Sequence, residues 1–263
     1  DPPSFTTKIS EVGDGVVYLE DSYCYPRGGG QPGDRGTISK NGIISKMNEV
    51  LPGEKIIHPV DQSDIFRKGD LVKCEIDRLW RNKNTVMHTA QHVFSAIAND
   101  MYGAETVGNQ ISENTTRIDL WFPDRDAFDS PDILNQVNSI FKNGADVLIH
   151  EWSREEILSH ENMRHTKFLD RIPATVDVLR VVEIEGIDLC PCGGTHVSNV
   201  RENNEEKFTK DSISIVTSVV ILAVVFILVR SYIYIPFEAA KVTPPLGKPS
   251  SVIEIQDNVC LLY

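Results

Sequence analysis

The chain has 263 residues and a formal net charge of −12, from 26 basic and 38 acidic side chains. This length allows one large or two small domains with a sizeable core. The net negative charge excludes a protein that binds nucleic acid through overall positive charge, so any RNA contact must use a local basic cluster. The five cysteines stand at scattered spacings that do not form a disulfide framework, which favours a reducing compartment.

Residues 1–77 are predicted to form short β-strands separated by turns. Apolar residues alternate or cluster between glycine-containing turns at residues 16–19, 36–38, 43–44, 55–58 and 71–76. Strands of this length and spacing are typical of a small barrel or an open antiparallel sheet. We therefore expect an N-terminal β-barrel-like domain over residues 1–77.

A glycine-rich loop from Tyr25 to Gly36 interrupts that domain, with the sequence Tyr-Pro-Arg-Gly-Gly-Gly-Gln-Pro-Gly-Asp-Arg-Gly. Consecutive glycines leave backbone amides unshielded, so these amides are available to phosphate or ribose oxygens. Judged by composition alone, a plain glycine-rich turn is the more frequent meaning of such a stretch.

A long helix is predicted from Arg78 to Tyr102, where apolar residues recur at helical spacing. Within it lies His-Thr-Ala-Gln-His, and its two histidines, His88 and His92, are four positions apart. Residues at this spacing share one face of a helix, so both imidazoles can point at one metal ion.

The stretch from Cys192 to His196, Cys-Gly-Gly-Thr-His, repeats the four-residue step with a thiol and an imidazole. Its two glycines allow a tight backbone turn that lets both side chains converge. Three imidazoles and one thiolate suit tetrahedral Zn²⁺. We predict one Zn²⁺ per chain, bound by His88, His92, Cys192 and His196; the same spacing selects Cys192 over Cys190.

The region between the two motifs alternates strands with short helices. Strand patterns occupy residues 108–111, 116–121, 147–152 and 178–184, and helix patterns occupy residues 131–143 and 153–158. The first of these helices opens on Ser130-Pro131-Asp132, a favourable start, and the second has the spacing of a capping box. Residues 78–200 are therefore expected to form the second domain.

The tail has a different composition. Residues 201–211 are polar and are expected to form a linker, whereas residues 212–229 carry no charge and are rich in Ile, Val and Leu. Such a run spans ~27 Å as a helix, close to the hydrocarbon thickness of a bilayer. We expect a transmembrane helix over residues 212–235 and a flexible tail over residues 236–263. Two buried strands, or an artificial end produced by a frameshift or a misjoined exon, are the alternatives.

Three motifs in this order, Gly-Gly-Gly-Gln-Pro-Gly-Asp, His-Thr-Ala-Gln-His and Pro-Cys-Gly-Gly-Thr-His-Val, resemble those of the alanyl-tRNA editing family. This family comprises free-standing AlaX-type proteins and the editing module of alanyl-tRNA synthetase. The resemblance covers roughly residues 5–200 and is closest to the medium-length AlaX form. The editing-like domain of threonyl-tRNA synthetase shares the paired His and Cys motifs, but the glycine-rich loop belongs to the alanyl branch.

The resemblance implies an α+β fold, in which a small N-terminal β-barrel precedes an editing domain whose antiparallel sheet packs against the zinc-bearing helix. It also implies a zinc-dependent aminoacyl-tRNA hydrolase that removes Ser or Gly from mischarged tRNA(Ala). The catalytic part would be cytoplasmic, with residues 212–235 as a candidate membrane anchor. ATP is not expected as a partner, because no aminoacylation domain is present.

Several residues acquire expected roles from this resemblance. Gln91 and Thr195 would position a water molecule or the seryl hydroxyl. The tRNA acceptor end would lie against Gly29, Gly30 and Gln31. Independently of the resemblance, Arg78, Arg81 and Lys83 form a basic cluster at the helix start, which is either a phosphate contact or simply a solvated helix start. A zinc protease is unlike this pattern, because Thr89 occupies the position after His88 where such proteases need Glu.

One departure from the family supports an alternative function. Family members continue after the Cys motif with a short hairpin that carries a basic residue near the pocket, and no such pattern follows Val200. This departure and the acidic balance favour a non-catalytic adaptor of the same fold, which would bind tRNA or be tethered to a membrane and keep zinc only to stabilise its structure.

Overall fold

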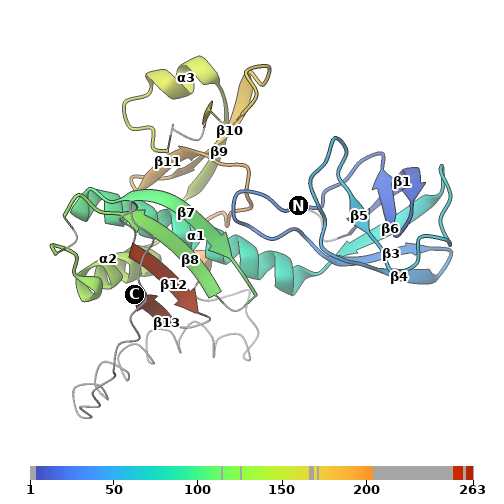
Figure 1. The fold of residues 1–263 in the computed structure, drawn as a ribbon, viewed down its shortest axis with the longest axis horizontal. Coiled ribbons are helices and arrows are strands. Elements are labelled where there is room, and N and C mark those ends of the chain that lie inside the picture. Colours follow the sequence, from blue (N-terminus) through green and yellow to red (C-terminus); the bar gives the residue numbers. More distant parts are fainter. Residues whose placement is uncertain are drawn as a thin grey trace, which may run out of the picture. The chain divides into compact units, whose positions relative to one another are not determined.

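The computed structural model describes residues 4–113, 115–124, 126–165, 169–170, 172–203, 251–256 and 259–262. The chain divides into two compact units (Figure 1). The first unit consists of residues 1–88 and 193–196, and the second consists of residues 89–192 together with those from 197 onward.

The first unit contains one antiparallel sheet with the strand order β4-β3-β6-β1-β2-β5. The strands are β1 (Ser4–Gly13), β2 (Val16–Leu19), β3 (Gly36–Lys40), β4 (Ile43–Met47), β5 (His58–Pro59) and β6 (Leu71–Ile76). A single antiparallel bridge between Met47 and Val60 links the two edges of the sheet. The structure thus has a half-barrel sheet with one bridge between its edges, which confirms in part the expected small barrel or open antiparallel sheet.

Alternation along the strands explains how this sheet encloses a core. In β6 every second residue is buried, namely Val72, Cys74 and Ile76. The predicted strands at 16–19 and 71–76 are confirmed, but the strand predicted at 55–58 is reduced to His58–Pro59. The long strand β1 was missed, because Thr7 takes one of its inward positions and weakens the apolar alternation in the sequence.

Helix α1 (Arg78–Tyr102) has the predicted bounds. Its first turn is capped by Asp77, whose Oδ1 accepts a hydrogen bond from the backbone N–H of Trp80 at 3.1 Å. Its end is marked by Gly103, which has a φ of 63°, a left-handed conformation that favours glycine. The predicted helix is confirmed over its full length.

The second unit contains two antiparallel sheets with the strand orders β11-β10-β9 and β13-β12-β8-β7. The strands are β7 (Glu105–Ile111), β8 (Thr115–Trp121), β9 (Val147–Ser153), β10 (Val178–Ile184), β11 (Asp188–Pro191), β12 (Ser251–Gln256) and β13 (Val259–Leu262). Val93 and Phe94 of α1 share a buried core with Ile118 of β8 and Val182 of β10. Strands β7 and β8 run across α1 (Figure 1), so the expected packing of an antiparallel sheet on this helix is confirmed.

Two short helices complete the second unit, α2 (Ser130–Asn143) and α3 (Arg154–Ser159), with a 3-10 turn η2 at Val200–Asn203. The N-cap of α2 is Asp129, whose carboxylate accepts the backbone N–H of Asp132 at 3.2 Å. In α3 the predicted capping box is confirmed, with Ser153 and Glu156 each bonding the other's backbone N–H.

The tail differs in part from the expectation. Residues 212–235, for which we expected a transmembrane helix, lie outside the described residues, and no helix in the described part of the chain is long and apolar enough to cross a membrane. Strands β12 and β13 lie in the segment expected to be a flexible tail. Strand β12 pairs with β8 from Ser251 opposite Leu120 to Gln256 opposite Thr115.

Candidate metal centre

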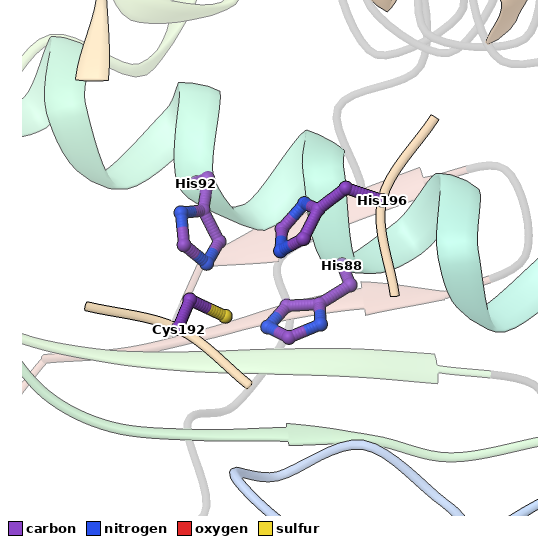
Figure 2. Close-up of side chains that lie close together, drawn as sticks. All are labelled: His88, His92, Cys192 and His196. Atoms are coloured by element: carbon purple, nitrogen blue, oxygen red, sulfur yellow. The ribbon is translucent and has the colours of Figure 1, made fainter. Parts of the chain in front are cut away.

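Four side chains that could hold a metal ion lie close together: His88 and His92 of α1, and Cys192 and His196 from the segment after β11. Each offers one ligand atom, and these atoms all lie within 4.8 Å of one another. Figure 2 shows the three imidazoles and the thiol facing one another. The structure therefore brings together the four residues that the two motifs predicted.

The β10–β11 hairpin delivers Cys192 to this position. The backbone N–H of Cys192 donates to the carbonyl of Arg180 at 3.1 Å, and Nη1 of Arg180 donates to the carbonyl of Cys192 at 2.8 Å. Two bonds to one residue of β10 thus hold the backbone of Cys192 just after the end of β11.

Gly194 allows the segment to pass close to His88. A Cβ atom at this position would lie 1.9 Å from Cε1 and 2.2 Å from Nδ1 of the His88 ring. A Cβ at Gly193 would meet nothing within 4 Å. Glycine is therefore required at position 194 because the His88 imidazole leaves no space for a side chain.

His88 is oriented by the glycine-rich loop. Its Nδ1 lies 2.8 Å from Oε1 of Gln31, a side chain with 1% exposure. The same oxygen accepts the backbone N–H of Thr195 at 3.0 Å, and Nε2 of Gln31 donates to the Thr195 hydroxyl at 2.9 Å. Gln31 thus binds both motifs at once.

The turn that presents Gln31 depends on two glycines. Gly28 and Gln31 exchange backbone hydrogen bonds at 3.1 and 2.9 Å. Between them Gly29 and Gly30 have φ values of 58° and 81°, in the left-handed region that other residues rarely adopt. The glycine run therefore shapes a tight turn that directs Gln31 inward.

His92 is oriented by Asp188 at the start of β11. Its Nδ1 lies 2.8 Å from Oδ2 of Asp188, a carboxylate that is 4% exposed. Burial raises the pKa of Asp188, but the hydrogen bond from His92, the neighbouring His165 and the Cys190 thiol together bring it below its ordinary value, so the carboxyl stays ionised. The carboxylate therefore accepts a hydrogen bond from Nδ1–H of His92.

Cys190 lies beside this pair, with its Sγ 3.4 Å from Nδ1 of His92 and 3.4 Å from Oδ2 of Asp188. His92, Asp188 and Cys190 form a second group of potential ligands. Burial raises the pKa of the Cys190 thiol to about 12. The geometry supports the choice of Cys192 as the sulfur ligand, because Cys192 groups with all three histidines whereas Cys190 lies beside Nδ1 of His92, which Asp188 already binds.

The donor set fits Zn²⁺. Side-chain oxygens hold Nδ1 of His88 and of His92, and this assigns the tautomer that leaves the lone pair of Nε2 for a metal. Three imidazole nitrogens and a thiolate are borderline-soft ligands of the kind that zinc prefers over magnesium or calcium. The residues present therefore suit the predicted ion.

The two predicted catalytic side chains have different surroundings. Gln91 is 2% exposed, and neither atom of its amide has a hydrogen-bond partner in the described part of the chain. The Thr195 hydroxyl is bonded to Gln31 and lies 2.7 Å from the hydroxyl of Thr85. Buried amides without partners are rare in proteins, which makes Gln91 the stronger candidate for a substrate contact.

The three residues of the predicted basic cluster have different surroundings. Nε of Arg81 donates to Oδ1 of Asp34 at 2.8 Å and its Nη2 donates to the carbonyl of Tyr23 at 3.0 Å. The side chains of this ion pair are only 11% and 2% exposed. Arg78 is exposed and Lys83 is partly exposed. Arg81 therefore fastens α1 to the glycine-rich loop, and surface charge remains at Arg78 and Lys83.

The sequence analysis did not identify Asp188 as a functional residue. It assigned Gln31 to a tRNA contact and did not foresee the hydrogen bond between Gln31 and His88. Carboxylates that orient metal ligands follow no fixed spacing from those ligands. The one signal available was the position of Asp188 in the stretch Asp-Leu-Cys-Pro-Cys, four residues before Cys192.

Comparison with known proteins gives a consistent result. A family model described as the threonyl and alanyl tRNA synthetase second additional domain matches residues 179–211, which include Cys192 and His196. An alanyl-tRNA editing protein AlaX-M of Saccharolobus solfataricus is 30% identical over 204 residues, which is 76% of this chain and 85% of that protein.

Longer proteins match as well. An alanyl-tRNA editing protein AlaX-L of Pyrococcus horikoshii is 33% identical over 195 residues, 71% of this chain but 45% of that protein. An alanine–tRNA ligase of a Synechococcus species is 30% identical over 226 residues, 80% of this chain and 23% of the ligase. The chain thus spans most of the medium-length relative and less than half of these two longer ones.

Proposed function

Since the chain belongs to the alanyl-tRNA editing family, we propose that it hydrolyses the ester bond between tRNA(Ala) and a wrongly attached amino acid. The observation that carries this proposal is the cluster of His88, His92, Cys192 and His196, in which Gln31 and Asp188 orient the two helix imidazoles. The finer proposal is that the attached residue is Ser or Gly and that one Zn²⁺ per chain is needed.

The proposed chemistry is metal-assisted hydrolysis of an activated ester. A Zn²⁺ ion held by the four ligands would supply a Lewis acid next to the ester carbonyl or to a water molecule. Gln31 and Asp188 keep Nδ1 of His88 and of His92 engaged, so that both rings present Nε2. Gln91 has a buried amide with both a donor and an acceptor to offer, and we assign it to orient the water or the seryl hydroxyl.

A peptidase role is disfavoured by Thr89. Its side chain is fully buried, and its hydroxyl accepts the backbone N–H of Val197 at 3.2 Å. It cannot deprotonate a metal-bound water, which is the role of Glu at this position in zinc proteases. An aminoacyl ester needs less activation than an amide, so the proposed substrate suits a site without that carboxylate.

For the tRNA partner, we propose that exposed groups around the glycine-rich loop contact the acceptor end. Gly29 and Gly30 have accessible backbone, and Arg78 and Lys83 are at the surface at the start of α1. Lys and Arg contacts to phosphates supply affinity without sequence specificity. Gln31 and Arg81 contribute indirectly, through the shape of the loop.

The alternative remains an adaptor of the same fold that uses zinc only for stability. One of its two grounds is weakened, because a hairpin of β12 and β13 does follow Val200 and pairs with β8. The acidic balance and the absence of Lys or Arg in residues 251–262 still favour it.

The test is deacylation of Ser-tRNA(Ala) and Gly-tRNA(Ala), compared with correctly charged Ala-tRNA(Ala), by the full chain. The variants are His196→Ala and, as a matched histidine control, His150→Ala, whose ring bonds Glu183 at 2.7 Å and is not among the four ligands. Selective release of Ser or Gly that is lost in His196→Ala and kept in His150→Ala is expected. No release by folded protein with bound zinc would favour the adaptor.

A further inference from the structure

Arg164 connects several parts of the second unit at one point. Its Nη1 donates to Oδ1 of Asn99 at 2.6 Å and its Nη2 donates to Oδ1 of Asp100 at 2.7 Å, both on α1. Its backbone N–H donates to the carbonyl of Leu189 in β11 at 2.8 Å, and its Nε lies 3.6 Å from Oδ1 of Asp188. One side chain thus joins the helix of His92 to the strand of Asp188.

The position of Arg164 meets a specific need of Asp188. One carboxylate oxygen, Oδ2, is committed to His92, whereas Oδ1 is buried and has no hydrogen-bond partner in the described part of the chain. An ionised carboxylate that is only 4% exposed is costly unless a positive charge lies close to it. The guanidinium of Arg164 supplies a positive charge 3.6 Å from this second oxygen.

We propose that Arg164 is a positioning residue for the metal centre, which fixes Asp188 and through it the orientation of the His92 imidazole. This inference rests on the metal centre of the proposed function. It adds Arg164 as the residue that supports Asp188, which in turn supports the ligand His92. Outer partners of metal ligands commonly change metal affinity by about 10- to 100-fold when they are removed.

The geometry requires arginine at this position. The planar guanidinium directs separate N–H groups to Asn99, Asp100 and Asp188, whereas a lysine ammonium is a single point of charge at the end of a flexible chain. A lysine ammonium could neutralise Asp188, or it could bond Asn99 and Asp100. It could not contact all three groups at these distances.

Zinc affinity of the full chain, measured by competition with a chromophoric chelator, tests the proposal in a double-mutant cycle of Arg164→Gln and Asp188→Asn. Arg164→Gln alone is expected to weaken zinc binding by about 10-fold. In the Asp188→Asn background it should change the affinity by less than about 2-fold, because the group through which Arg164 acts is gone. Co²⁺ absorption of the single variant should also shift, since the ligand field reports the imidazole orientation.

Arg154→Gln is the matched control. Arg154 also bonds with its guanidinium, to the backbone carbonyls of Leu169, Ile172 and Pro173 in the same unit, and none of these bonds involves Asp188 or His92. It should leave zinc affinity within about 2-fold of the parent, which separates a general loss of packing from the proposed effect. If Arg164→Gln does not fold by circular dichroism, Arg164→Lys takes its place in the cycle.

Equal losses in both Asp188 backgrounds, or no loss from Arg164→Gln, would overturn the proposal. A parent protein that binds no zinc would overturn both this proposal and the metal centre. Intact zinc binding with the expected cycle but no deacylation would refute only the proposed hydrolase, and the positioning role of Arg164 would stand.

Discussion

Oε1 of Gln31 accepts a hydrogen bond from Nδ1 of His88 at 2.8 Å, although 57 positions separate the two residues in the chain. This bond joins the glycine-rich loop to the first histidine of the helix, so two motifs that look independent in the sequence serve one site. Gly29 and Gly30 supply the turn, and Gln31 supplies the contact.

The first prediction concerns this bond. Gln31→Ala should weaken zinc binding by about 10- to 100-fold, because the His88 ring loses the acceptor that fixes its tautomer and orientation. Chelator competition measures the effect. Gln110→Ala, at an exposed position of β7, is the control and should bind zinc like the parent. Parent-like affinity for Gln31→Ala would show that the Gln31 amide does not support His88.

The two glycines of the Cys motif should respond differently to an added methyl group. In Gly194→Ala the new Cβ would overlap the His88 ring, whereas in Gly193→Ala it would enter open space. Gly194→Ala should lose stoichiometric zinc, measured by elemental analysis of purified protein, and Gly193→Ala should retain it. Full zinc occupancy in both variants would mean that the ring can move aside without cost.

Stability should depend on pH through His58, which is fully buried and lies 2.8 Å from the Ser22 hydroxyl by its Nε2. Burial lowers the pKa of His58 from 6.5 to about 4. Between these pH values the unfolded chain binds a proton that the folded chain does not, so the free energy of unfolding falls as the pH is lowered from 6.5 toward 4. The loss from this group alone is ~3 kcal/mol.

Urea unfolding of His58→Gln and the parent at pH 7 and pH 4.5 measures this dependence. The variant should be less stable than the parent at pH 7, because the buried ring packs in the core. Its free energy of unfolding should fall less than that of the parent on acidification. Substitution of the exposed His160 by Gln serves as the control and should leave the parent's pH dependence unchanged. Parallel pH profiles for His58→Gln and the parent would contradict the assignment.

Arg81 and Arg78 should separate structural charge from tRNA-binding charge. Arg81→Ala leaves the Asp34 carboxylate buried without its partner, and such a change costs about 3–5 kcal/mol in the free energy of unfolding. Arg78→Ala is at an exposed position and should change stability by less than about 0.5 kcal/mol. Chemical denaturation measures both effects.

Arg78→Ala also tests the tRNA contact. Arg78→Ala should weaken binding of tRNA and reduce its salt dependence, as expected for the loss of one phosphate contact. Unchanged tRNA affinity for folded Arg78→Ala would remove this residue from the proposed interface, and a stability loss below about 1 kcal/mol for Arg81→Ala would contradict the buried ion pair.

Local patterns in the sequence were sufficient for much of the architecture. Helix α1 and strands β2 and β6 have the predicted bounds, because their apolar spacing reflects a single buried face. Strand β10 also has the predicted bounds, and its apolar run reflects burial on both faces. The four potential metal ligands were also identified from two short spacings, since a four-residue step on a helix, or across a tight glycine turn, brings both side chains of a pair together.

Contacts between distant residues needed the tertiary structure. The inward direction of Gln31, the burial of Arg81 against Asp34, and the support of His92 by Asp188 join positions from 47 to 96 residues apart. No spacing rule encodes such partners, because packing of the whole chain decides which polar groups are removed from water and must therefore find one another.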